Sequence, residues 1–133
     1  MKLLRTTFLN HLLGGVDAVR EYLEANEDRE FVTTTLNLKE IAVGRELQGA
    51  LDWHEIRSTF DWVRFVPFER EHAVLAGELE APLHRNDEIN QDKINALAGD
   101  VLVAAVASEQ NATVVTENTD DFDLLGVPVE TYR

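Results

Sequence analysis

Short apolar runs rich in β-branched residues alternate along this chain with longer segments whose apolar residues recur at helical spacing. The alternation is typical of βα units, because a parallel strand needs a crossover, usually a helix, before the next strand can pair with it. The sequence therefore predicts an α/β fold with three layers, in which helices cover both faces of a central parallel sheet of four or five strands.

The expected elements can be placed by residue range. We expect strands at residues 2–5, 30–34, 64–67 and 112–116, with a short edge strand at 127–130. We expect helices at residues 6–13, 16–23, 35–50, 53–63, 69–83 and 100–110. Residues 84–95 are polar without periodicity and are expected to form a loop. No repeat or linker interrupts the pattern, so residues 1–133 are expected to form a single domain.

The composition narrows the class of protein. The chain has 133 residues, with 25 Asp and Glu against 12 Lys and Arg, a net charge of −13 and no cysteine. The missing cysteines exclude disulfides and thiolate metal sites. An acid-rich, lysine-poor surface resembles that of proteins from salt-loving archaea, and it equally suits docking to a basic partner. Both explanations remain open.

The sequence predicts no association with membranes. No apolar stretch approaches the length of a membrane span. The apolar run at the start is broken by Arg5, Asn10 and His11, and it lacks the small-residue cleavage site of a signal peptide. We therefore expect a soluble, cytoplasmic protein.

Charged and polar side chains follow the predicted strands. Residues 5–7 follow the first strand, Glu40 lies early in the helix after the second, Asp100 opens the most apolar helix, and residues 116–122 follow the fourth strand. Ligands of an open parallel sheet bind outside the carboxyl ends of its strands, so these residues are expected to converge. Mg²⁺ and Mn²⁺ prefer such oxygen ligands, and they can neutralise phosphate charge and activate water.

Each of these acids also has a plainer explanation. Asp100 could be a helix cap, Glu40 a solvated charge on a helix face, and the aspartates of residues 120–123 an acidic turn. No single residue decides between the two. Their shared position after strands favours one site.

Four segments of the chain resemble the PIN-domain family, and most closely its VapC-type ribonuclease toxins. These segments are LLRTTFL (residues 3–9), TTLNLKEI (34–41), DVLVAA (100–105) and ATVVTENTDDF (112–122). The likeness covers nearly the whole chain in order and spacing.

The resemblance implies a Mg²⁺- or Mn²⁺-dependent endoribonuclease that acts as the toxin of a toxin–antitoxin pair. By position, Glu40 and Asp100 match metal ligands, Asn118 matches the fourth site position, and Asp121 is a further acid beside it. The resemblance further implies a homodimer, an RNA substrate and a small VapB-type antitoxin that inserts basic residues into the acidic pocket.

Two threonines complete the carried-over site. Thr7 and Thr116 match the polar residues that usually brace the pocket of PIN domains. Arg5 is the departure, because it stands where the family has its first aspartate. We expect its guanidinium to fork onto Glu40 or Asp100. At about 4 Å and an effective dielectric near 20, a +1 and a +2 charge repel by roughly 8 kcal/mol, so metal binding is expected to be weak or absent.

Two functional hypotheses follow from Arg5. One is a VapC-type ribonuclease toxin inactivated at its first ligand position, and the alternative is a catalytically dead PIN module that binds antitoxin or RNA without cleaving it. A metal titration discriminates them. Phosphatases and receiver domains also place acids at strand ends, but both need an aspartate where the first strand here ends in Arg5.

Three further sets of residues carry weaker signals. The histidines lack metal-ligand spacing and are expected to be surface or packing residues: His11, His54, His72 and His84. Aromatic residues expected to pack the core, or to border an interface, are Trp53, Phe60 and Trp62. The candidate phosphate contacts outside the pocket are Lys39, Arg45, Arg64, Arg85 and Lys93.

Overall fold

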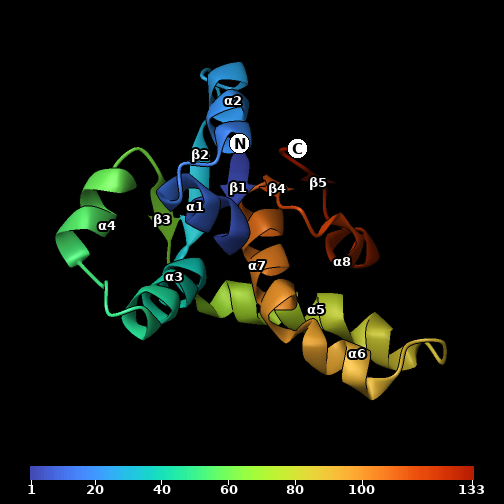
Figure 1. The fold of residues 1–133 in the computed structure, drawn as a ribbon. Coiled ribbons are helices and arrows are strands. Elements are labelled where there is room, and N and C mark those ends of the chain that lie inside the picture. Colours follow the sequence, from blue (N-terminus) through green and yellow to red (C-terminus); the bar gives the residue numbers. More distant parts are fainter.

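The computed structural model describes residues 1–133 and contains one five-stranded sheet, ordered β3-β2-β1-β4-β5 (Figure 1). Strand β1 (Lys2–Leu4) lies at the centre between β2 (Phe31–Thr34) and β4 (Thr113–Val115). The edges are β3 (Arg64–Val66) and β5 (Val129–Glu130). All four pairings are parallel, which confirms the predicted sheet.

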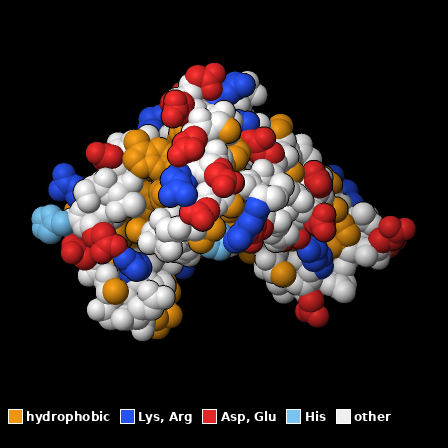
Figure 2. All heavy atoms as spheres, turned by 45° about the horizontal axis from the view of Figure 1, so that its top comes forward, with side chains coloured by type: hydrophobic (Ala, Val, Ile, Leu, Met, Phe, Trp, Pro, Cys, Tyr) orange, Lys and Arg blue, Asp and Glu red, His pale blue; other side chains and the backbone are white.

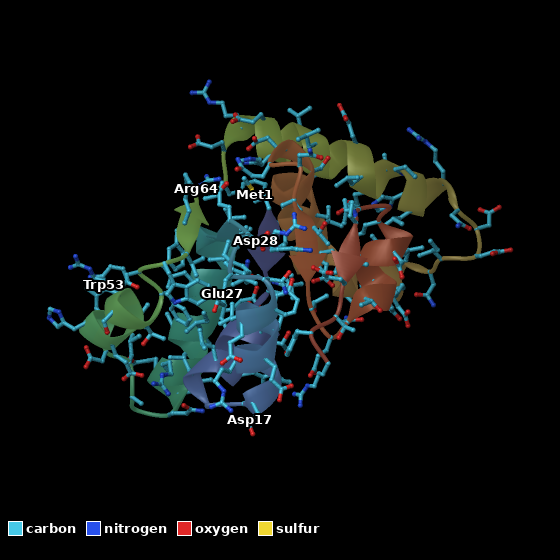
Figure 3. All side chains as sticks on the ribbon, turned by 90° about the horizontal axis from the view of Figure 1, so that it is seen from above. Met1, Asp17, Glu27, Asp28, Trp53 and Arg64 are labelled. Carbon is cyan, nitrogen blue, oxygen red and sulfur yellow. The ribbon has the colours of Figure 1, made fainter.

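Eight helices connect these strands. They are α1 (Thr6–Leu13), α2 (Asp17–Ala25), α3 (Thr35–Leu47), α4 (Trp53–Thr59), α5 (Arg70–Arg85), α6 (Gln91–Ala96), α7 (Ala98–Glu109) and α8 (Thr119–Leu124). The ribbon shows α5 and α7 covering the sheet on a different side from α1 and α3 (Figures 1 and 3). None of these helices combines the length and apolar character needed to cross a membrane.

The sheet separates two hydrophobic cores. Leu3 and Val114 belong to the larger core, which α5, α7 and α8 complete, whereas Leu4 and Val115 belong to the smaller core beneath α1, α3 and α4. Successive side chains of a strand point to opposite faces, so each three-residue strand supplies both cores. The predicted three-layer arrangement is thus confirmed.

Helix α7 is apolar around most of its surface because it is enclosed on most sides. Val103 to Ala107 are all completely buried, and the helix packs against α5, α8 and β4. An apolar surface of this extent is expected only for a helix inside a protein. The helix therefore holds its first turn, which contains Asp100, in a fixed position.

The loop predicted at residues 84–95 is present only at residues 86–90, and the prediction is wrong for the residues on either side. Helix α5 continues to Arg85, and α6 begins at Gln91. The Asn90 side chain accepts a hydrogen bond from the Lys93 backbone N–H at 2.8 Å, and Ile94 is buried in the larger core. A helix of six residues is too short to show periodicity, so only this cap signals its presence.

Other element boundaries differ by smaller amounts. Strand β1 ends at Leu4, and α4 ends at Thr59 rather than near residue 63. The aspartates at residues 120–123 lie on the short helix α8, not in a plain turn. The core position of Phe60 is confirmed. The predicted core position of the two tryptophans is wrong, because Trp53 is 56% exposed and Trp62 is 39% exposed.

The surface carries many ion pairs. Figure 2 shows Asp and Glu spread over the face drawn, with Lys and Arg between them. Eight of the twelve basic side chains pair with carboxylates: Lys2, Arg5, Arg20, Arg29, Arg45, Arg64, Lys93 and Arg133. The four without such a partner are Lys39, Arg57, Arg70 and Arg85. Few cations are therefore free to meet an anionic ligand.

Candidate active site

A cavity of about 770 Å³ lies where β1 and β4 end and α1, α3, α7 and α8 begin. Its lining contains every site residue expected from the sequence, together with five others: Arg5, Thr6, Thr7, Glu40, Ala96, Gly99, Asp100, Thr116, Glu117, Asn118, Asp121 and Phe122. The parallel sheet explains this convergence, since the carboxyl ends of its strands meet at one edge.

Arg5 lines this cavity. Its backbone is extended after β1, with its N–H donating to the Val115 carbonyl at 3.2 Å, and this directs the side chain into the cavity. The guanidinium donates from Nη2 to Asp100 at 2.7 Å and lies 3.3 Å from a Glu40 oxygen through Nη1. Only 14% of the Arg5 side chain is exposed. The predicted fork onto the acids is confirmed, and it reaches both of them.

Asn37 also binds Arg5, a contact that the sequence pattern did not predict. Its Oδ1 accepts from Arg5 Nη1 at 2.6 Å, and it is completely buried. Thr34, the N-cap of α3, fixes this orientation, since its hydroxyl oxygen accepts from the Asn37 backbone N–H and from Nδ2. Asn37 lies three residues before Glu40, which places both on one face of α3. That spacing was the available signal.

Three threonines lie at the cavity. Thr6, rather than Thr7, contacts the polar cluster, with its hydroxyl 3.0 Å from Asn37 Oδ1 and 3.1 Å from a Glu40 oxygen. Thr7 lies in the cavity lining. Thr116 accepts the Asn118 backbone N–H at 3.2 Å, so it orders the turn that leads into α8.

Asp100 lies in the first turn of α7 but does not cap it. The N-cap position is Leu97, and no side chain caps the helix, so the plainer explanation for Asp100 is wrong. Burial raises the pKa of the Asp100 carboxyl, the nearby Asp121 raises it further, and Arg5 opposes both. Burial outweighs the ion pair here, because the carboxylate loses more hydration on burial than the charge of Arg5 restores.

Asp121 sits on the other side of Asp100 and is held by two donors. Lys93 Nζ donates to one of its oxygens at 2.7 Å, and Asn118 Nδ2 donates to the other at 2.6 Å. The hydrogen bond from Lys93 lowers the pKa of Asp121, against the effect of burial. The two coupled carboxyls thus shift in opposite directions, and a shared proton favours Asp100. Lys93 belongs to α6, which explains why its place at the site was not foreseen.

The model of the PIN domain matches residues 3–127 of this chain. The chain belongs to the PIN-domain family, whose members are generally nucleases. No curated protein matches it.

Solved structures similar to this PIN domain include a toxin–antitoxin complex from Klebsiella pneumoniae, with a TM-score of 0.76, 19% identity and coverage of 100% of this chain and 98% of that one. FitAcB from Neisseria gonorrhoeae has a TM-score of 0.77 and 23% identity, with coverage of 99% of this chain and 98% of that one. DNA-bound VapBC from Salmonella typhimurium has a TM-score of 0.77 and 19% identity, with coverage of 99% of this chain and 98% of that one. Identities this low show a shared fold alone.

The polar cluster of this PIN domain does not fit a divalent cation in the arrangement observed. Oxygen atoms that could coordinate an ion already accept hydrogen bonds from cations, Asp100 and Glu40 from Arg5 and Asp121 from Lys93. An ion placed among them would meet the Arg5 charge at close range. The resident cation of this cavity is therefore a side chain.

A second group of metal-ligand residue types lies at the other end of α7. Glu71, His72 and Glu109 place one ligand atom each within 4.8 Å of one another. However, His72 Nδ1 accepts the Glu69 backbone N–H at 2.8 Å, so the ring proton resides on Nε2 and points to Glu109 at 2.6 Å. A metal would need the Nε2 lone pair. His72 is instead a buried packing residue that completes the capping box of α5, in line with its predicted role.

Proposed function

We propose that this chain is a VapC-type PIN toxin whose metal-dependent ribonuclease site is silenced by Arg5. The observation that carries the proposal is the Arg5 guanidinium, bound to Asp100 at 2.7 Å and close to Glu40, in a cavity otherwise rich in carboxylates. The resemblance to PIN domains puts an aspartate at this position. The similarity to structures described as toxin–antitoxin complexes supports the toxin assignment.

The remaining residues of the site suit the chemistry of the family. Glu40, Asp100 and Asn118 would offer oxygen ligands to Mg²⁺ or Mn²⁺, with Asp121 as a further acid. When bound, such an ion neutralises phosphate charge and supplies a nucleophilic water for attack on the phosphodiester of RNA. In this chain Arg5 takes the place of that charge and supplies no water.

The partners that suit this site are a VapB-type antitoxin and a second copy of the chain. Glu40 and Glu117 line the cavity with 40% and 39% of their side chains exposed, so a cationic side chain of the antitoxin can still reach them. Arg5 neutralises part of the negative charge. Antitoxin binding is therefore expected to be weaker than for the Arg5→Asp variant.

The test is an Arg5→Asp substitution, with Arg70→Asp as the control for a two-unit change in charge on the exposed surface. Mn²⁺ binding is measured by calorimetry, and RNA cleavage is measured with and without chelator, both at low and high salt. We expect metal binding and chelator-sensitive cleavage only in the Arg5→Asp form. Equal cleavage by the original chain would refute the silencing, and an Arg5→Asp form that binds no metal would refute the nuclease assignment.

The second candidate is a PIN module that binds antitoxin or RNA without cleaving it. The low exposure of the Arg5–Asp100 ion pair favours this candidate, because a pair held at 14% and 12% side-chain exposure is a stable part of the fold. The same experiment separates the two, since a dead module would gain no cleavage from Arg5→Asp even where it gains metal binding.

A further inference from the structure

We propose that a groove beside α4 binds a nucleobase of the single-stranded RNA that flanks the cleavage position. This inference rests on the proposed function. The groove has a volume of about 720 Å³ and lies between α3, α4 and β3, separate from the acidic cavity. Its lining is mainly apolar, with Ile56, Phe60 and Phe65 among its walls.

Trp53 is the residue that would stack the base. It is the first residue of α4, 56% exposed, and it lies at the outer margin of the molecule (Figure 3). The Cζ atom of Arg57, one helical turn later, lies 5.9 Å from the centre of the Trp53 ring. An exposed aromatic ring beside an arginine is the combination that holds single-stranded nucleic acid without reading its sequence.

The free cations of the protein favour a polyanion here. Only four basic side chains lack a carboxylate partner, and two of them, Lys39 and Arg57, lie on α3 and α4. The groove lining contains one of these cations, Arg57, and one carboxylate, Asp61, while Lys39 lies outside the lining on the neighbouring helix α3. On a chain with net charge −13, a free cation in the lining of an apolar groove and a second one on the adjacent helix are a specific feature.

Helix geometry joins this groove to the acidic cavity. Leu38 lines the groove and Glu40 lines the cavity, and residues along a helix are 100° apart. Lys39 is exposed and lies between them on the solvent side of α3, since Asn37 and Ile41 are buried on the other side. A strand of RNA leaving the cavity would thus pass Lys39 before it reaches Trp53.

An apolar groove can bind a peptide as well as a nucleobase, and the neighbouring charges distinguish the two. A purely apolar peptide would gain nothing from the charges of Lys39 and Arg57. A nucleotide uses all three features, because its phosphate meets a cation while its base stacks on the ring. The arrangement therefore favours RNA over a protein segment.

The experiment measures binding of a short single-stranded RNA by fluorescence anisotropy, with the chain as it stands and chelator present so that nothing is cleaved. We expect Trp53→Ala to weaken binding about 10-fold, as loss of one stacked base does. Lys39→Gln should weaken it and lower the salt dependence by about 0.7 in the logarithmic slope. The matched controls Trp62→Ala and Arg70→Gln should bind like the original chain.

The outcomes separate this inference from the proposed function. If Trp53→Ala and Trp62→Ala bind RNA equally, the groove does not hold a base. If Trp53→Ala weakens antitoxin binding but not RNA binding, the occupant is a protein. Placing Trp53→Ala in the Arg5→Asp form gives a second readout, with KM for RNA expected to rise about 10-fold at similar kcat. If Arg5→Asp cleaves RNA and Trp53→Ala leaves its KM unchanged, the groove alone is refuted. If the original chain binds no RNA and the Arg5→Asp form does not cleave it, both proposals are refuted.

Discussion

Replacing Arg5 with methionine removes the charge of the buried cluster and keeps most of the side-chain volume. Asp100 then loses its 2.7 Å partner while only 12% of its side chain is exposed. Breaking a buried ion pair from one side costs about 3–5 kcal/mol, and partial exposure places this case near the lower end. We expect Arg5→Met to lower the free energy of unfolding by about 3 kcal/mol at pH 7.5, or roughly 10 °C in Tm for a chain of this length.

The same loss is expected to depend on pH. The pKa of Asp100 is already raised by burial, and Arg5 is the group that opposes this shift. Without Arg5 the pKa rises further, so protonation removes the uncompensated charge more readily. The destabilisation is therefore full above the raised pKa of the variant and shrinks as the pH falls through it.

Urea denaturation of both forms at pH 7.5 and pH 5 measures this difference, with Arg70→Met as the control for loss of one exposed positive charge. The control should change stability by less than about 0.5 kcal/mol. A loss below about 1 kcal/mol for Arg5→Met, or one that is the same at both pH values, would contradict the assigned role of Arg5.

Three further predictions concern other parts of the molecule. Lys93→Gln should raise the pKa of Asp121, which carboxyl NMR can follow. The lowered pKa of Asp121 in the folded chain contributes stability above the unfolded pKa of about 3.9, and this stability is lost as the pH falls through the folded pKa. The variant lacks part of this contribution, so it should unfold at a higher pH during acid denaturation. His72→Phe should cost about 1–3 kcal/mol in urea, because the Glu69 N–H loses its acceptor, whereas Glu71→Gln should be neutral. With a net charge of −13, Tm should rise with KCl towards about 1 M, and an unchanged Tm would show that self-repulsion is unimportant.

The sheet and most of the cavity lining could be predicted because they depend on local pattern and topology. β-branched runs mark the strands, and parallel pairing brings their ends to one edge regardless of details. For Arg5, its position at the end of a buried strand beside acids was enough to predict a fork. That Arg5 contacts both Asp100 and Glu40 depends on the relative positions of α3 and α7, and no local sequence pattern contains this information.

The residues that were missed depend on packing between elements. Lys93 reaches Asp121 only because α6 forms, and a helix of six residues has no periodicity to read. The exposure of Trp53 was also unpredictable, because its spacing to Ile56 matches a core face. Ile56 lies in the smaller core, whereas Trp53, the first residue of α4, remains outside it.

A cluster of carboxylates at the end of a sheet needs a cation for stability before it needs one for chemistry. In this chain Arg5 pairs with Asp100 and Glu40, and Lys93 pairs with Asp121. Each of these three acids therefore has a basic side chain of the same chain as its counter-ion. The stabilisation by an ion that binds only the folded state grows with the logarithm of the ion concentration above its Kd, whereas a side chain stabilises the fold without any dissolved ion. Under the proposed function, arginine at position 5 would supply the structural role of an ion without supplying an activated water. The fold would then not require a bound ion, and Arg5→Asp is expected to make stability depend on Mn²⁺.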